Sequence, residues 1–408
     1  MSTTLTIDWA PDELPPEVRV EPYALRTHDG AAVTGLLYRA GNPSTVVCLM
    51  HPREYFGFHY LVPSLVRAGV AVWAQGSRSI GLDIRLEHEL ALLDVAAGLA
   101  NLNALGYERI ILLGNSGGAG LFCFYHEQAE RPPAERLAKT AGGRLVPLNE
   151  AELPTIAGLV LLAPHPGQGR LLLGCVDPSV LDERDPLSVD PGLDPFSPAN
   201  GYSSQPGGSR YPPSFVQRYR QAQVARVRRL DETARELTKR RMEARARLKR
   251  GAGGNGDAVA AAHTPIMTVW RTDADLRCLD LTLDPSDRKP GSVWGQDMLA
   301  SNYGAVGFGR TCTPESWLSS WSGLSSQAAL ERTAPAIQCP AAVIEYTGDQ
   351  TTFPSTIADI VRWIGTRDKV HIRVRGDHHG RPLESGETPG RALAGDAIAD
   401  WLRQHDFL

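Results

Sequence analysis

An apolar segment that runs into a serine between glycines constrains this chain more than any other feature. A run of strand length at residues 109–113 is followed by Gly114-Asn115-Ser116-Gly117-Gly118, and residues 119–125 are apolar and compatible with a helix. Strand, glycine-flanked serine and helix are the context of a nucleophile elbow, a sharp turn that exposes the serine hydroxyl at the edge of a sheet. We therefore predict that Ser116 is a nucleophile.

The glycines have a steric reason to be there. A serine at such a turn holds a positive φ, and a side chain at position 114 or 118 would collide with neighbouring backbone. Two other interpretations remain open. One is a glycine-rich turn with an incidental serine. The other is a phosphate-binding loop, which is disfavoured because no Lys-Ser or Lys-Thr pair follows the glycines.

Composition limits the class of protein. The chain has 408 residues, a net charge of −4 and six cysteines. A chain this long buries a large core without disulfides and forms one large domain or two. The small net charge gives no field that would recruit nucleic acid or anionic lipid. The cysteines are far apart and form no C-x-x-C pair, which argues against a zinc site or a redox dithiol. We expect no metal, no cofactor, no nucleic-acid partner and no membrane partner.

The N-terminal segment bears on localisation. Residues 1–20 contain four acidic residues and three prolines but no apolar core, which excludes an ordinary secretory signal. Apolar runs such as 156–163 are far shorter than the roughly 20 residues that a membrane helix needs. We therefore expect a cytoplasmic protein.

Strand patterns alternate with helix patterns along most of the chain. Asp29-Gly30 separates two alternating segments and predicts a hairpin. Alternation of strands and helices predicts an α/β fold with a mostly parallel, doubly wound sheet, whose ligands bind at the carboxyl ends of the strands. The predicted strands are 19–26, 31–38, 45–50, 70–74, 109–113, 156–163, 341–346 and 370–375, and the predicted helices are 58–68, 86–105, 119–125, 354–365 and 392–404.

The alternation stops between residues 164 and 335, a stretch rich in Pro, Gly, Ser and Asp. We predict that 164–335 is a large, mainly helical cap insertion, and that 1–163 and 336–408 form the core. Residues 215–250 lack Gly and Pro and carry 13 Lys and Arg against 4 Asp and Glu, which predicts a long charged helix. This helix is either a solvated surface or a contact with an acidic partner or a second copy of the chain. Residues 251–262 are expected to be a flexible tether.

The cap is aromatic in its second half. Six aromatic residues within about fifty positions favour a small-molecule substrate with a sizeable apolar or aromatic part, although each such residue is more often buried in a core. They are Trp270, Trp294, Tyr303, Phe308, Trp317 and Trp321.

Two further polar residues follow predicted strands and complete a catalytic set. Asp349 comes after the strand at 341–346, and His378 after the strand at 370–375. A serine hydroxyl needs a base near neutral pH, and the imidazole needs a buried carboxylate to hold its tautomer. The chain order Ser116, Asp349, His378 is that of α/β-hydrolases. His379 is an alternative base.

The loop after the strand at 45–50 begins His51-Pro52-Arg53-Glu54 and lies where one oxyanion amide is expected, the other being that of Gly117. Pro52 has no N–H, so we assign the donor to Arg53, with Glu54 as the alternative. The His-Pro pair is otherwise a strand terminator. We name four candidate substrate-binding residues: His51, Tyr55, His165 and Trp321.

Four segments resemble the α/β-hydrolase superfamily, and the resemblance covers roughly residues 19–163 and 336–408. The segments are Met50-His51-Pro52, the elbow at 114–118, Glu345-Tyr346-Thr347-Gly348-Asp349 and Gly376-Asp377-His378. The cap resembles that of a bacterial serine hydrolase subgroup. Pro52 departs from the common His-Gly oxyanion motif. The resemblance implies a Ser-His-Asp hydrolase, and an ester is the expected bond. Amide, thioester and carbon–carbon bond hydrolysis use the same residues, and a non-catalytic binding module is the alternative of another class.

Overall fold

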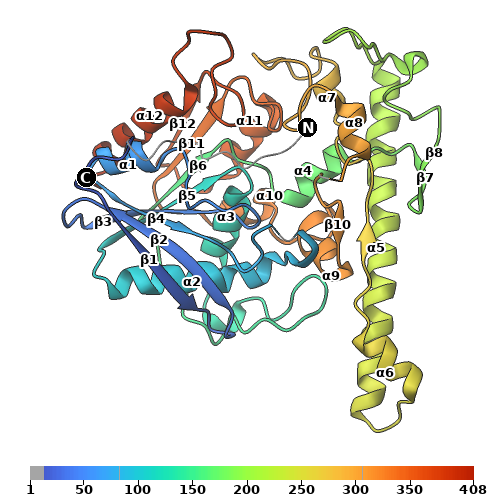
Figure 1. Cartoon of the computed structure of the whole chain (residues 1–408), viewed down its shortest axis with the longest axis horizontal. Coiled ribbons are helices and arrows are strands. Elements are labelled where there is room, and N and C mark those ends of the chain that lie inside the picture. Colours follow the sequence, from blue (N-terminus) through green and yellow to red (C-terminus); the bar gives the residue numbers. More distant parts are fainter. Residues whose placement is uncertain (1–12, 82, 306) are drawn as a thin grey trace.

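Eight strands form one central sheet in the order β1-β2-β4-β3-β5-β6-β11-β12 (Figure 1). The computed structural model describes residues 13–81, 83–305 and 307–408, so most of the predicted N-terminal segment 1–20 lies outside the described residues. β2 is antiparallel to β1 and β4, and the other neighbouring pairs are parallel. The strands are β1 (Arg19–Arg26), β2 (Ala32–Arg39), β3 (Thr45–Met50), β4 (Ala71–Gln75), β5 (Arg109–Asn115), β6 (Gly158–Leu162), β11 (Ala341–Tyr346) and β12 (Lys369–Val374).

The strands form where the sequence pattern predicts them because the central ones are buried on both faces. β3, β4, β6 and β11 are buried along their whole length, as strands of a covered parallel sheet are. Successive residues of β3 alternate between two apolar clusters: Cys48 lies in one and Leu49 in the other. The predicted mostly parallel α/β sheet is confirmed.

Helices cover both faces of the sheet. On one face lie α2 (His88–Ala104), α3 (Gly118–Ala129) and α11 (Pro354–Trp363), and on the other α1 (Val62–Arg67) and α12 (Gly390–Gln404). α1 is shorter than the predicted helix at 58–68. Pro63 occupies the first turn of α1, where a proline is tolerated because the N–H groups of that turn have no acceptor within the helix. Residues 58–61 form turns instead of helix.

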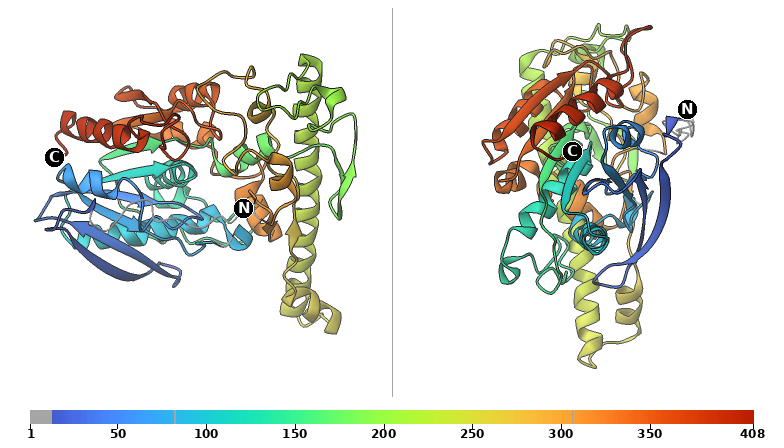
Figure 2. Two further views of the ribbon diagram at one scale, coloured as in Figure 1. Left: turned by 45° about the horizontal axis from the view of Figure 1, so that its top comes forward. Right: turned by 90° about the vertical axis from the view of Figure 1, so that its left-hand side faces the viewer.

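The segment between β6 and β11 is mainly helical. It lies against the end of the sheet that is formed by the carboxyl ends of the parallel strands (Figure 2). An apolar cluster within it contains Trp317, Trp321, Leu171 and Val227, and Leu86 from before α2 joins that cluster. Its last part packs elsewhere, because Leu330 belongs to the cluster beneath α3 and α11. The elements are α4 (Gln168–Cys175), β7 (Val180–Asp182), β8 (Asp185–Val189), α5 (Pro213–Lys249), α6 (Asn255–Ala262), β9 (Met267–Thr268), α7 (Leu276–Leu279), α8 (Met298–Tyr303), β10 (Thr311–Cys312), α9 (Pro314–Ser316), a π-helical turn (Trp317–Trp321) and α10 (Leu330–Thr333).

The predicted flexible tether at 251–262 is wrong, because most of it is helix α6, which packs antiparallel to the end of α5. Arg245 Nε donates to the Ala261 carbonyl at 3.2 Å, and Arg247 pairs with Asp257 at 2.7 Å. Asp257 also accepts the Gly254 N–H at the start of the helix. Alanines 258 and 260–262 favour a helix, and these contacts outweigh the preceding glycines.

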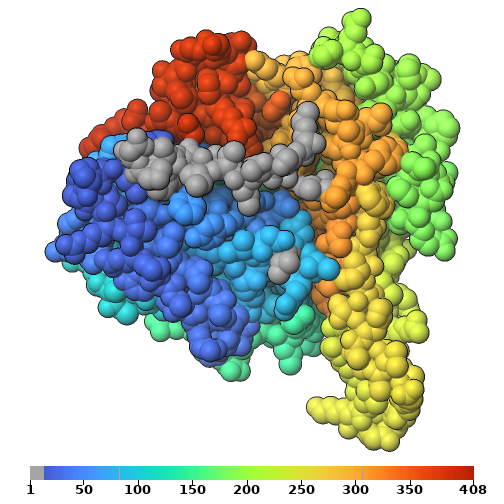
Figure 3. Space-filling model, in the orientation of Figure 1, coloured from blue at the N-terminus to red at the C-terminus, as the bar shows by residue number. Residues whose placement is uncertain are grey.

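The end of α5 and α6 project beyond the rest of the molecule (Figures 1 and 3). We call residues 242–262 the α5–α6 arm. In the part of the chain that the structure describes, no helix combines the length and apolarity required to cross a lipid bilayer.

Candidate active site

Ser116 lies on a strained turn between β5 and α3. Its φ is 57°, in the left-handed region that residues with a side chain rarely adopt, and its N–H donates to the Leu162 carbonyl at 2.9 Å. A Cβ added at Gly114 would lie 2.7 Å from the Ala119 backbone, and one at Gly118 would lie 2.5 Å from the Met50 carbonyl oxygen. The turn predicted from the sequence, and the steric need for its two glycines, are therefore present.

The structure brings Ser116, His378 and Asp349 together although they are distant in sequence. Ser116 Oγ lies 3.0 Å from His378 Nε2, and His378 Nδ1 lies 2.7 Å from Asp349 Oδ2. The other carboxylate oxygen of Asp349 accepts the N–H groups of Thr351 and Thr352 at 2.6 and 3.0 Å. Ser116 is partly exposed, whereas the other two side chains are buried. The hydroxyl can therefore pass its proton to an imidazole whose far nitrogen is held by a fixed carboxylate.

Electrostatics keep this pair in the charge states that such a transfer needs. Burial disfavours the imidazolium, but the facing Asp349 carboxylate outweighs it and raises the pKa of His378 above its usual value. Burial likewise favours a neutral acid, but His378 and the two threonine amides together lower the pKa of Asp349. Asp349 is thus an anion at neutral pH, and His378 is a base of raised strength.

His379, the alternative base, does not contact Ser116. It is exposed, and its N–H donates to Asp377 Oδ1 at 2.9 Å. Its ring centroid lies 5.3 Å from that of His378 in an edge-on arrangement. The geometry therefore places His378, and not its neighbour, at the serine.

His165 contacts the serine from the end of the neighbouring strand β6. Its Nε2 lies 2.9 Å from Ser116 Oγ, and its backbone N–H donates to the Ser116 carbonyl at 3.1 Å. The chain turns toward His165 at Ala163, which has a φ of 44°. Burial and the nearby His378 lower the pKa of His165 to about 3, so this ring is neutral. Its Nδ1 has no partner among the described residues.

The loop after β3 differs from the prediction. The N–H groups of Arg53 and Glu54 donate to His51 Nδ1 at 3.2 and 2.9 Å. The structure therefore does not place Arg53, or its alternative Glu54, as an oxyanion donor, because the His51 ring already engages both amides. The Gly117 N–H, in contrast, donates to no acceptor within the described part of the chain.

The structure of DcsB in complex with its substrate analogue matches with a TM-score of 0.50 at 10% identity, covering 95% of this chain and 100% of that chain. This match and the strand order with a single antiparallel β2 decide the fold. The chain has the α/β-hydrolase fold. At this identity the likeness concerns the fold alone.

Two further structures align at lower scores. The α/β hydrolase GrgF from Penicillium sp. sh18 has a TM-score of 0.46 at 11% identity, covering 95% of this chain and 97% of that chain. The monoacylglycerol lipase of Paleococcus ferrophilus has a TM-score of 0.41 at 15% identity, covering 95% and 99%. No protein-family model and no curated protein matches the sequence itself.

In this α/β-hydrolase fold, two of the predicted substrate-binding residues form no hydrogen bond with Ser116. Trp321 is fully buried in the apolar cluster of the cap, where its Nε1 donates to the Asp83 carbonyl at 3.5 Å. Its burial with Trp317 fits the large contribution that aromatic side chains make to protein cores. Tyr55 is 38% exposed, and its ring meets Phe58 at a centroid distance of 6.1 Å.

Sequence reasoning missed Gln168. A Cβ added at Gly117 would lie 2.7 Å from Gln168 Nε2 and equally far from His51 Nε2, so both side chains border the elbow. Gln168 is buried and follows Gly167, whose φ is 110°. It lies in the insertion, outside every motif of the core, and only its position close after the strand at 156–163 could have suggested it.

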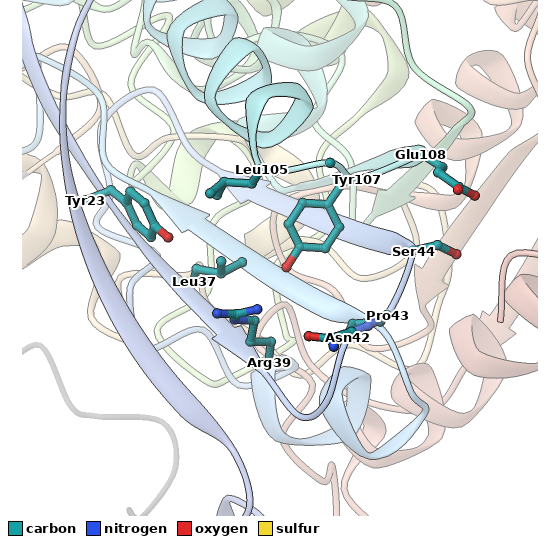
Figure 4. A pocket seen from close by; sticks show the side chains of 10 residues that line it. Tyr23, Leu37, Arg39, Asn42, Pro43, Ser44, Leu105, Tyr107 and Glu108 are labelled. Atoms are coloured by element: carbon teal, nitrogen blue, oxygen red, sulfur yellow. The ribbon is translucent and has the colours of Figure 1, made fainter.

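Ser116 lines neither of two recesses in the described part of the chain. One of about 350 Å³ lies at the opposite end of the strands, where Tyr23, Arg39 and Tyr107 point toward one another (Figure 4). Its polar groups are partly engaged, since Arg39 and Tyr23 both bond Glu21. A cavity of about 10 Å³, the size of one water molecule, lies between cap and core beside Phe308 and Thr351. The described residues contain no cluster of His, Cys, Asp or Glu that could hold a metal ion.

Proposed function

We propose that this protein is a serine hydrolase that cleaves a carboxylic ester through an acyl-enzyme. One observation carries the proposal: Ser116 Oγ, the His378 ring and the Asp349 carboxylate form a continuous hydrogen-bonded relay at a strained elbow. Strained backbone and paired groups of shifted pKa concentrate at sites of chemistry. A serine that served only structure would need neither the positive φ nor the buried ion pair behind its partner.

The reaction uses this relay twice. Ser116 Oγ attacks the ester carbonyl carbon while its proton moves to His378 Nε2, and Asp349 stabilises the imidazolium. The carbonyl oxygen becomes an oxyanion beside the Gly117 N–H. When this intermediate collapses, the bond to the alcohol oxygen breaks and His378 returns the proton to that oxygen. Water then repeats the sequence on the acyl-enzyme and releases the acid.

An ester is favoured over an amide on chemical grounds. An alkoxide leaves with less help from an acid than an amine does, and the relay contains a single proton carrier, His378. Hydrolysis of a thioester or of a carbon–carbon bond uses the same catalytic groups and is the alternative reaction. We therefore expect ester hydrolysis to be faster than hydrolysis of the matched amide.

We propose that the substrate has an apolar or aromatic part that packs near Phe308. The Phe308 ring lies edge-on to His165 at a centroid distance of 6.4 Å, and Arg53 lies 5.9 Å from the centre of the same ring. Phe308 is thus an aromatic residue of the cap close to the serine. The close fit of cap and core implies that the cap moves when a larger substrate enters.

The test is a matched series of p-nitrophenyl esters and p-nitroanilides of increasing acyl length, assayed with the wild type and Ser116→Ala. We expect ester hydrolysis with a burst of p-nitrophenol equal to the enzyme concentration, and loss of both in the variant. Anilide hydrolysis faster than ester hydrolysis would contradict the assignment of the bond. A variant as active as the wild type would contradict the mechanism.

We also propose that α5 contributes a contact with a second copy of the chain. The net charge of residues 215–250 is +9. Because the net charge of the whole chain is −4, the remaining residues carry a net charge of −13. On the α5–α6 arm, Met242 and Val259 are 50% and 62% exposed. We expect a dimer in sedimentation equilibrium that dissociates in Met242→Asp/Val259→Asp and weakens at high salt. A monomer at every salt concentration would contradict this contact.

A further inference from the structure

We infer that the side chain of His51 supplies the second oxyanion donor of this site, through its Nε2–H. The inference rests on the proposed function and adds to it a residue with a stated role. In the arrangement expected from the sequence, a backbone amide of the loop after β3 would have performed this role. Here the loop amides bind one nitrogen of the His51 ring, and the other nitrogen of the same ring faces the elbow.

The hydrogen bonds from the two backbone amides fix the tautomer of His51. Nδ1 lies 3.2 Å from the Arg53 nitrogen and 2.9 Å from the Glu54 nitrogen, and both groups are donors. Nδ1 must therefore act as an acceptor and carries no proton. In a neutral imidazole the proton is then on Nε2, which is a donor.

Nε2 lies beside the residue that follows the nucleophile. A Cβ added to Gly117 would be 2.7 Å from His51 Nε2, so the ring occupies the space that a side chain at position 117 would fill. The Gly117 N–H, the expected first donor, belongs to the same residue. A substrate oxygen bound by that N–H therefore lies next to a second N–H group from the imidazole. No described residue accepts a hydrogen bond from His51 Nε2.

The surroundings hold His51 neutral and fixed. The side chain is buried, and its ring packs against Phe56 at a centroid distance of 5.2 Å. Burial, together with the Arg53 guanidinium and the rings of His165, His88 and His378, lowers the pKa of His51 well below its usual value. A neutral ring does not compete with His378 for the serine proton at neutral pH, and a fixed donor needs no reorganisation as the oxyanion develops.

This geometry also explains why Pro52 is tolerated. Pro52 has no backbone N–H to donate, and the next two backbone N–H groups, those of Arg53 and Glu54, donate to the His51 ring. The loop therefore contributes a side-chain donor in place of a main-chain donor. Its position is set by three attachments: the bonds from Arg53 and Glu54, and the bidentate pair of the Arg53 guanidinium with Asp83 at 2.7 and 2.8 Å.

Two variants of His51 separate the two nitrogens. In His51→Asn the side-chain oxygen occupies about the position of Nδ1 and still accepts the loop amides, but no donor reaches the position of Nε2. In His51→Gln the side-chain nitrogen reaches about the position of Nε2, but the acceptor for the loop is lost. A purely structural His51 therefore predicts that Asn is tolerated and Gln is damaging, whereas an oxyanion donor predicts the reverse order for kcat.

The experiment measures kcat and KM for a short p-nitrophenyl ester, the inhibition constant of a trifluoromethyl ketone, and thermal unfolding. We expect His51→Asn to lower kcat by about 10²-fold to 10³-fold with little change in KM or in the unfolding temperature, the range for loss of one oxyanion donor. The ketone should bind more weakly by a similar factor, because its hemiketal oxyanion needs the same donor. His51→Gln should retain more of kcat than His51→Asn.

Two results would overturn the inference, and they are distinguishable from failure of the proposed function. If the wild type hydrolyses the ester and His51→Asn has the same kcat, His51 is not the donor although the enzyme assignment stands. If His51→Gln loses more of kcat than His51→Asn, the ring acts through the loop only. If the wild type has no activity and no reaction with the ketone, the proposed function fails and this inference fails with it.

Discussion

Ser116 Oγ and His165 Nε2 lie 2.9 Å apart, so the proposed nucleophile contacts a second imidazole besides that of His378. A hydroxyl has one proton to donate, and it can serve only one of the two rings as a base. Asp349 stabilises a positive charge on His378, whereas no described residue pairs with His165 Nδ1. We conclude that Ser116 donates to His378 and accepts from His165.

The first prediction follows from this division. His165→Phe keeps an aromatic ring beside His378 but removes the donor to the serine, and we expect kcat to fall by about tenfold, the value of one neutral hydrogen bond. His378→Phe should lower kcat by about 10³-fold or more. Steady-state kinetics on one ester measure both effects. The opposite order would show that His165 is the base.

The second prediction concerns the adjacent histidines. His378→Ala removes the ring that contacts Ser116 and should abolish nearly all activity. His379→Ala removes an exposed ring without a contact to the serine and should leave kcat near that of the wild type. Rates are compared at equal folded fraction, judged by circular dichroism. If His379→Ala lowers kcat more than His378→Ala does, His379 is the base.

The third prediction is the pH dependence of kcat/KM. The base must be neutral to accept the serine proton, so activity is lost as pH falls through the pKa of His378, which Asp349 holds above 6.5. We expect a single acidic limb with a midpoint above 6.5, since His165 titrates at about 3. Asp349→Asn removes the carboxylate that raises the pKa, and it should shift this limb to lower pH and lower kcat by about 10⁴-fold. A midpoint that stays in place would contradict the role of Asp349.

Much of the fold could be predicted from the sequence because burial on both faces leaves a readable pattern. β3 spans the same residues, 45–50, in the prediction and in the structure, because it is an unbroken run of mostly β-branched and apolar residues. The Asp-Gly pair predicts the hairpin, and in the structure its two strands pair from Arg19 opposite Arg39 to Arg26 opposite Ala32. The positions of Ser116 and Asp349 follow from the same rule, since each lies just past a buried parallel strand, whereas His378 follows β12, an edge strand that is largely exposed and is recognised by its pattern alone.

Other features depend on contacts that no local pattern records. The alanine-containing segment after residue 254 becomes helix α6 because α5 offers it partners, and the glycines before it suggested a tether. The sequence predicts the Arg53 amide as an oxyanion donor, but the His51 ring accepts a hydrogen bond from this amide, and no local pattern fixes the rotamer of that ring. The prediction of Trp321 as a substrate contact rests on aromatic density, which does not distinguish a pocket from the interior of the cap, where this ring is buried.

The fourth prediction tests the steric basis of the elbow. Gly118→Ala places a Cβ 2.5 Å from the Met50 carbonyl oxygen, and we expect the free energy of unfolding to fall by about 1–3 kcal/mol, as for other overpacked sites. Gly256→Ala is the matched control, because a Cβ there meets nothing within 4 Å and the residue lies in α6. The control should be neutral or stabilising by about 0.5–1 kcal/mol. Equal urea unfolding curves for Gly118→Ala and the wild type would contradict the model of a crowded turn.

The fifth prediction concerns the nucleophile itself. A fluorophosphonate reacts with a serine only where a base removes the hydroxyl proton and donors stabilise the oxygen of the adduct. Ser116 is partly exposed and bonded to His378, so we expect one adduct per chain, located on the peptide that contains residue 116. Ser116→Ala should be unlabelled while its unfolding curve matches that of the wild type.

Mass spectrometry of the intact protein after this labelling is the most direct test of the central claim that Ser116, His378 and Asp349 act as one unit. The account predicts stoichiometric labelling of the wild type, none of Ser116→Ala, and labelling slowed by about 10³-fold or more in His378→Ala. A folded wild type that takes up no fluorophosphonate, or a Ser116→Ala variant that is labelled as fast as the wild type, would contradict it.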